Sequence, residues 1–266
     1  MQQLQTQTPN NELLSFALAI MAANEHDGIC NFDTLFSKNV PHIMEKIFFF
    51  LDYESYKECL EVSDEWRGLL TSERYKTKGK SVFREGILED EKKLQIAAGG
   101  QGNTNEVRRL LSSGMVDVNC QDHNKWTPLY AAADKGHKEV AQLLIKSGAN
   151  PNVTNIWGLS ALHLAVDRGH AHVTKLLIEL GAEPNVADSL GRTPLHWAAR
   201  NGNEYVVQLL IQSRAELNVC DEDGGTPLHE AASWRRKEVA QLLIESGADM
   251  NKADNVGNIP SQYLKD

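Results

Sequence analysis

The sequence predicts an all-α protein in which a solenoid, a linear stack of short repeated units, follows a small helical module. Three observations predict this: a four-residue motif that recurs every 33 residues, helix-start signals at the same place in each period, and an apolar helical stripe upstream of the repeat. A fixed period of this length is typical of stacked units, none of which buries its apolar face alone. Such a stack offers an extended surface rather than a closed pocket, which favours protein binding over catalysis.

The repeat is marked by a Thr-Pro-Leu-His motif. It reads Thr-Pro-Leu-Tyr from Thr127, Ser-Ala-Leu-His from Ser160, and Thr-Pro-Leu-His from Thr193 and Thr226. The hydroxyl can cap a helix start, and proline suits the first helical position because its missing N–H would be unpaired there. A turn precedes each motif and a second apolar helical stretch follows it, so each unit should be a β-turn with two antiparallel helices.

These units resemble the ankyrin repeat, whose pattern is T-P-L-H-x-A-A followed by G-A-D-x-N. We therefore expect an ankyrin-repeat α-solenoid over residues 86–266, with atypical units at its ends. The matching segments are a degenerate first unit (88–121), four full units (122–154, 155–187, 188–220 and 221–253) and a partial cap (254–266). The resemblance implies protein binding. The sequence shows no nucleophile–base arrangement, phosphate loop or metal-ligand cluster, so we expect neither an enzyme nor a cofactor.

Three histidines recur with the motif: His163, His196 and His229. The resemblance implies that each ties neighbouring turns together through a hydrogen bond. A shared metal ion is disfavoured, because units stacked roughly 10 Å apart cannot bring their ligands to one ion.

Some residues depart from the repeat. Lys125 replaces a turn glycine, and Arg214 stands where the other full units have glycine. If the backbone at residue 214 is left-handed, a non-glycine residue costs about 1 kcal/mol there. The fourth full unit has Ser-Trp-Arg-Arg over residues 233–236 in place of an Asn-Gly break. Tryptophan and arginine dominate binding hot spots, which suggests a functional role; drift in a tolerant loop is the alternative.

Partners of ankyrin proteins usually lie along the turn tips and the exposed side of the first helices. Three tryptophans should share this concave face and form an anchor set, unless they only pack against neighbouring turns. The expected target-binding residues are Trp126, Lys135, Trp157, Arg168, Arg192, Arg200, Trp234 and Arg235.

The segment over residues 37–85 resembles an F-box and should form a small three-helix module with its linker. The family pattern is a Leu-Pro start, an apolar helix ending in Leu-Asp, and a later stretch with leucine, Val-(Cys/Ser) and tryptophan. Val40 replaces the leading leucine, and Ser63 stands where cysteine is frequent. The matching residues, expected to bind the adaptor or hold the module together, are Pro41, Ile43, Ile47, Leu51, Leu60, Val62 and Trp66. The polar start of the tail over residues 1–36 predicts partial disorder there.

The F-box resemblance implies docking on the Skp-family adaptor of a cullin–RING ubiquitin ligase, with the repeats binding an unknown target protein. The chain would then be the substrate-recognition subunit of an SCF-type ligase. One alternative is an ankyrin scaffold or inhibitor with no ligase connection, in which the helical module only caps the stack. Another is an F-box decoy or effector that occupies the adaptor.

The composition of the chain argues against some classes of binding partner and cellular location. The net charge of −9 argues against nucleic acid or an anionic membrane as the main partner. An 11-residue apolar run over residues 13–23 is too short to span a bilayer. The four cysteines form no CxxC pair, which is consistent with a reducing compartment and predicts a cytoplasmic or nuclear protein.

Overall fold

The computed structural model describes residue 57 and residues 84–263. The chain divides into two compact units, residues 1–90 with 113–116 and residues 91–112 with 117–266. Within the first unit, Lys57 forms an ion pair with the buried Asp90 (Nζ to Oδ2, 3.2 Å). The second unit contains the repeats.

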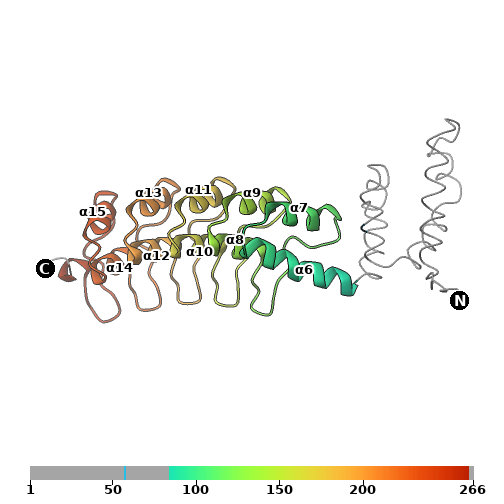
Figure 1. The fold of residues 1–266 in the computed structure, drawn as a ribbon. Helices are drawn as coiled ribbons and strands as arrows, with labels where there is room; N and C mark the ends of the chain where they lie inside the picture. The colour runs from blue at the N-terminus through green and yellow to red at the C-terminus, as the bar shows by residue number, and fades with distance from the viewer. Residues whose placement is uncertain (1–56, 58–83, 264–266) are drawn as a thin grey trace, which may run out of the picture. The chain divides into compact units, whose positions relative to one another are not determined.

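In the repeat unit, helices alternate between an inner and an outer row (Figure 1). Each inner helix packs on the inner helices of its neighbours, and all but the last described one also pack on the outer helix that follows. The inner row is α8 (Pro128–Lys135), α10 (Ala161–Asp167), α12 (Pro194–Asn201), α14 (Pro227–Ser233) and the short α16 (Pro260–Tyr263). The outer row is α7 (Thr104–Ser112), α9 (Lys138–Lys146), α11 (Ala171–Glu179), α13 (Glu204–Gln212) and α15 (Lys237–Glu245). A longer helix, α6 (Arg84–Gly99), comes before them.

The turns that precede the inner helices project away from the outer row (Figure 1). Over residues 84–263 there is no strand, and the single β pairing is an isolated bridge between Thr154 and Ser160. The all-α repeat stack that the sequence predicts is therefore confirmed for this part of the chain.

In α10, α12 and α14 the repeated motif starts the helix with a reciprocal pair of hydrogen bonds, a capping box. The hydroxyl of Ser160 accepts the backbone N–H of His163, and the His163 ring returns the contact by accepting the backbone N–H of Ser160 at Nδ1 (3.0 Å). Thr226 and His229 make the same reciprocal pair. Because a carboxamide or carboxylate normally closes such a capping box, the imidazole here does the work of glutamate or glutamine.

The same imidazoles join successive units. With Nδ1 accepting a backbone N–H, the neutral ring carries its proton on Nε2, and that N–H donates to a carbonyl in the next turn. The acceptors all lie 29 residues further along, at 3.2 Å: Arg192 for His163, Gly225 for His196 and Asn258 for His229. The tie between neighbouring turns that the family resemblance implies is confirmed.

Asparagines spaced by 33 residues form a second ladder after the outer helices. Each one bonds the next unit twice, since its Nδ2 donates to a carbonyl and its Oδ1 accepts a backbone N–H. The pairs are Asn119 with Gly148 and Asn150, Asn152 with Gly181 and Glu183, and Asn185 with Arg214 and Glu216.

A third ladder covers the ends of the inner helices. The last carbonyls of a helix have no partner within the helix. Here a side chain from the next unit donates to one of them: His170 to Asp134 (3.1 Å), Asn201 to Asp167 (3.0 Å) and Arg236 to Arg200 (3.0 Å). Together the three ladders fix the spacing of the units.

Between residues 84 and 263, three non-glycine residues adopt a left-handed backbone: Lys125 (φ 59°), Arg214 (φ 65°) and Arg235 (φ 55°). The condition under which Arg214 carries backbone strain is therefore met. The equivalent glycines, Gly148 and Gly181, have nothing within 4 Å of a built Cβ, so Arg214 carries only backbone strain.

Lys125 is more crowded. At the equivalent Gly158, a Cβ would lie 2.8 Å from the backbone nitrogen of Ser189 in the next turn. The hydrogen bond between successive turns is longer beside Lys125 than beside Gly158. It measures 3.2 Å from the N–H of Ile156 to the carbonyl of Asn124, against 2.9 Å from Ser189 to Trp157. We attribute the longer hydrogen bond to the Lys125 Cβ.

We predict that Lys125→Gly stabilises the protein by about 1 kcal/mol, because it removes both the left-handed strain and this contact. Arg214→Gly should gain less than half as much, since the added chain entropy of glycine offsets relief of the backbone strain alone. Urea denaturation of the two variants measures the difference. Equal effects would contradict the crowding at Lys125.

We also predict that stability falls as the pH drops from about 6.5 toward 4. Burial lowers the pKa of His163 to about 4, below the roughly 6.5 of an exposed histidine. The unfolded chain therefore takes up a proton more readily than the folded one, and the stability present above pH 6.5 is lost below it. For His163 alone the loss between pH 7 and pH 5 should be about 2 kcal/mol.

His163→Gln is the matched variant for this measurement. Glutamine already occupies the equivalent position at Gln262, whose Oε1 accepts the N–H of Ile259 (3.0 Å). Chemical denaturation at pH 7 should show a cost within about 1 kcal/mol, whereas the loss between pH 7 and pH 5 should be smaller than in the parent. An identical pH dependence in both proteins would show that His163 does not titrate as proposed.

Candidate target-binding surface

The candidate surface is formed by the turn tips and the exposed side of the inner helices, where the eight target-binding residues were expected. In the structure these residues differ in their position in the repeat and in how far they are exposed to solvent. Trp157 lies in a turn tip and is 46% exposed, whereas Trp234 ends α14 and is 49% exposed. Trp126 is only partly accessible: its ring lies 6.0 Å from that of Tyr130, and its Nε1 is buried. The structure therefore does not bring the three tryptophans into one exposed set.

Lys135 and Arg168 share one carboxylate. Asp134 is the second-last residue of α8, and its two oxygens pair with Lys135 Nζ (2.9 Å) and Arg168 Nε (2.7 Å). Burial by itself raises the pKa of Asp134, but the hydrogen bonds and charges of Lys135 and Arg168 outweigh it and hold that pKa below its usual value. Asp134 therefore stays ionised and fixes Arg168 across the boundary between two units.

In the third full unit, Arg192 is held between a carboxylate and an aromatic ring. Its guanidinium contacts Asp188 Oδ2 through Nε (3.0 Å) and a terminal nitrogen (2.9 Å), and its Cζ lies 4.5 Å from the centre of the Trp197 ring. The Trp197 indole N–H donates to the same Asp188 oxygen (3.2 Å). Burial raises the pKa of Asp188, but the Arg192 backbone N–H and side chain outweigh this effect and lower it. The charge of Arg192 is thus largely neutralised within the protein.

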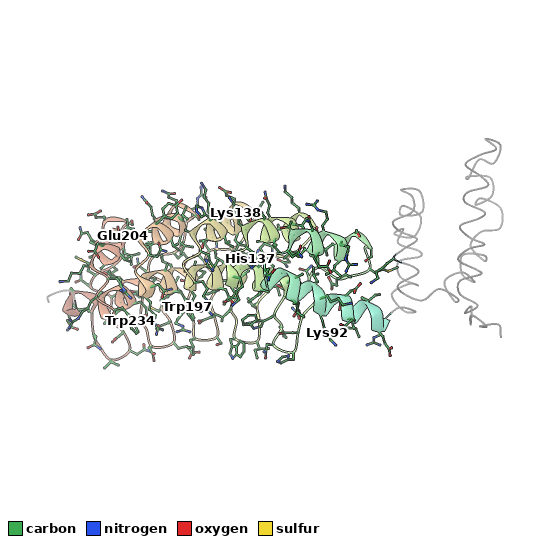
Figure 2. All side chains as sticks on the ribbon, in the orientation of Figure 1. Lys92, His137, Lys138, Trp197, Glu204 and Trp234 are labelled. Atoms are coloured by element: carbon green, nitrogen blue, oxygen red, sulfur yellow. The ribbon has the colours of Figure 1, made fainter. Side chains whose placement is uncertain are left out.

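A second arginine–tryptophan pair joins α12 and α14. Arg200 Cζ lies 4.6 Å from the centre of the Trp234 ring, a separation at which the cation is attracted to the ring face. Figure 2 shows Trp197 and Trp234 on these neighbouring inner helices. Glu230, half-buried between the two pairs, has its pKa raised by burial, and the charges of Arg200 and Arg192 only partly offset this effect.

Sequence reasoning missed three members of this surface: Asp188, Trp197 and Glu230. The position of Trp197 in the repeat is the signal that could have found two of them. At this position of the 33-residue repeat, the four units from Ala131 to Glu230 have alanine, leucine, tryptophan and glutamate. The position before it is always tyrosine or histidine, the position after it is always alanine, and both are buried. Such variation predicts a position that is not part of the core, and the structure shows it half-buried at Ala131, Trp197 and Glu230 but buried at Leu164. Asp188 gives no such signal because every full unit has Asp or Asn there.

The chemistry of this surface is that of binding. Arginine guanidinium groups, indole rings and a half-buried carboxyl group offer hydrogen bonds, charge and apolar area. In the part of the chain that the structure describes, no group of three or more His, Cys, Asp and Glu side chains could hold a metal ion. None of the described helices combines the length and apolar character that a bilayer crossing requires.

The expected adaptor-binding residues cannot be placed. Pro41, Ile43, Ile47, Leu51, Leu60, Val62 and Trp66 lie outside the described residues.

Comparison with known proteins agrees with the repeat architecture. The family model for ankyrin repeats in three copies matches twice, over residues 94–188 and 162–254, which together cover more than half of the chain. Human oxysterol-binding protein-related protein 1 is 44% identical over 63 residues, 23% of this chain and 7% of that protein.

Bovine ankyrin repeat domain-containing protein 49 is 33% identical over 93 residues, 35% of this chain and 37% of that protein. Its human counterpart is 36% identical over 67 residues, 25% of this chain and 28% of that protein. The chain therefore spans less than two fifths of the length of these relatives. The stacked helix pairs, the hydrogen-bond ladders between them and the family match show that the chain belongs to the ankyrin-repeat family. This family is typically a non-catalytic protein-binding fold.

Proposed function

We propose that this chain is a substrate receptor, which binds a target protein on the inner-helix surface and presents it to an SCF-type ubiquitin ligase. Membership of the ankyrin-repeat family supports the binding half of the proposal. The observation that carries it is the second arginine–tryptophan pair, Arg200 with Trp234, which spans two inner helices and stays accessible. Paired arginine and tryptophan side chains on a rigid surface are typical binding hot spots.

The ligase half of the proposal rests on the F-box-like sequence of residues 37–85. A module of this kind would dock on a Skp-family adaptor and, through it, on a cullin. The chain would contribute proximity rather than chemistry, because a bound target has its lysines held close to the charged conjugating enzyme. A scaffold or inhibitor without a ligase, and a decoy that occupies the adaptor, use the same repeat surface.

We predict that Ile47→Asp combined with Leu51→Asp abolishes binding to a Skp-family adaptor. Both residues belong to the apolar stripe of the F-box-like segment, and a buried unpaired charge there is strongly unfavourable. Co-expression of the chain with the adaptor, followed by size-exclusion chromatography, should give a stable complex for the parent and none for the variant. A retained complex, or none with the parent, would contradict the ligase role.

A second prediction concerns the target. Replacing Trp234 and Arg235 together by alanine should weaken target binding by at least about 2 kcal/mol, the scale of a hot spot. Quantitative pull-down with the parent and the variant measures this loss, and thermal melting checks that the variant is folded. If a folded variant retains the same partners at the same yield, Trp234 and Arg235 are not part of the binding surface.

A further inference from the structure

The arginines of the inner-helix surface fall into two groups. Arg168 and Arg192 are paired with buried carboxylates, as described above. Arg200, Arg235 and Arg236 have no carboxylate within ion-pair distance among residues 84–263. These three, with Trp234, form what we call the arginine patch. It lies where α12 and α14 end and α15 begins.

Contacts within the patch hold its members together. The Nε of Arg236 donates to the carbonyl of Arg200 (3.0 Å), and the Arg200 guanidinium lies over the Trp234 ring. Each contact fixes one part of a side chain and leaves guanidinium N–H groups available. An arginine guanidinium has five donors, so Arg200 and Arg236 retain most of their hydrogen-bonding capacity toward a ligand.

Arg235 has a left-handed backbone, which is unusual for a residue other than glycine. Its equivalents in the preceding units are Gly136, Gly169 and Gly202, all left-handed. At Gly136 a Cβ would lie 2.7 Å from the His170 ring, and at Gly202 it would lie 2.6 Å from the side chain of Arg236.

Arg235 itself is exposed, so the described residues leave space for its side chain. The left-handed strain remains, and none of the described residues forms an ion pair or hydrogen bond with the Arg235 side chain. Strain that no internal contact offsets is characteristic of functional positions.

We propose that the arginine patch binds an acidic segment of the target protein, with carboxylates on the guanidinium groups and an apolar side chain on the exposed part of Trp234. This proposal rests on the proposed target-binding function and names the chemistry of the partner. Charge complementarity carries it: three arginines with no carboxylate partner among residues 84–263 lie at the ends of two neighbouring inner helices of a chain whose net charge is −9. Carboxylates bind guanidinium groups bidentately, which gives both strength and orientation.

Glu230 does not fill this role. It hydrogen-bonds the Trp234 side chain and its charge interacts with Arg200, but it is half-buried and lies outside ion-pair distance of Arg200. Cations at the end of α14 also complement the helix dipole, but that effect needs a single charge and acts on stability rather than on binding.

The test uses the full chain and a fluorescein-labelled peptide with four glutamates around one phenylalanine, measured by fluorescence anisotropy at two salt concentrations. The test variant replaces Arg200, Arg235 and Arg236 by glutamine. The matched control replaces Lys138, Lys146 and Lys175 by glutamine; these outer-helix residues carry the same total charge, and Lys138 is labelled in Figure 2. We expect at least about tenfold weaker binding for the test variant and less than twofold for the control.

Arg235→Gly is a second variant, which relieves the backbone strain and so should remain folded even if the triple variant does not. Arg235→Gly should weaken binding of the glutamate peptide by a few-fold. Equal losses in test and control variants, no binding by the parent, or tighter binding of a lysine-substituted peptide would each overturn the proposal. More than tenfold tighter binding of a phosphoserine peptide would overturn the assignment to carboxylates.

Target capture separates this inference from the proposed function. If the test variant retains the proteins that the parent captures, the patch is not the recognition site but target binding stands. If the parent itself captures no protein, the proposed function fails.

Discussion

The repeat stack depends on a neutral imidazole that makes two hydrogen bonds in opposite directions. In each of three units, histidine Nδ1 accepts the N–H that starts its own helix, and Nε2–H donates to a carbonyl in the next turn. A protonated ring would place a donor against a donor at the helix start. Local helix initiation and the spacing between units are therefore set by one side chain in one protonation state.

This coupling explains how a linear stack of repeated units can hold a binding surface rigidly. The histidines fix the turns, the asparagines fix the loops after the outer helices, and the third ladder fixes the ends of the inner helices. Side chains that recognise a target must be held in place before binding, since each one ordered on binding lowers affinity. Arg236 belongs both to the third ladder and to the arginine patch, so the same side chain stabilises the stack and takes part in the proposed binding.

Much of this arrangement could be predicted from the sequence because the repeat is read four times. Periodicity located the inner helices, the capping motif and the left-handed position at Arg214. The arginine–tryptophan pairs could not be predicted in the same way, since they join residues such as Arg200 and Trp234 that occupy different positions in consecutive units. The sequence also did not reveal which arginines are paired with carboxylates. Arg192 and Arg235 look alike in the sequence, yet one is neutralised by Asp188 and the other is unpaired within the described residues.

The tautomer of the repeated histidines tests the central claim most directly. A long-range ¹H–¹⁵N correlation spectrum of the imidazole nitrogens at pH 7, with each histidine assigned by substitution, distinguishes the neutral Nε2–H form from the Nδ1–H and charged forms. The structure predicts the Nε2–H form for His163, His196 and His229. An Nδ1–H or protonated ring at these positions would contradict the ladder on which the stack, and the surface it carries, depends.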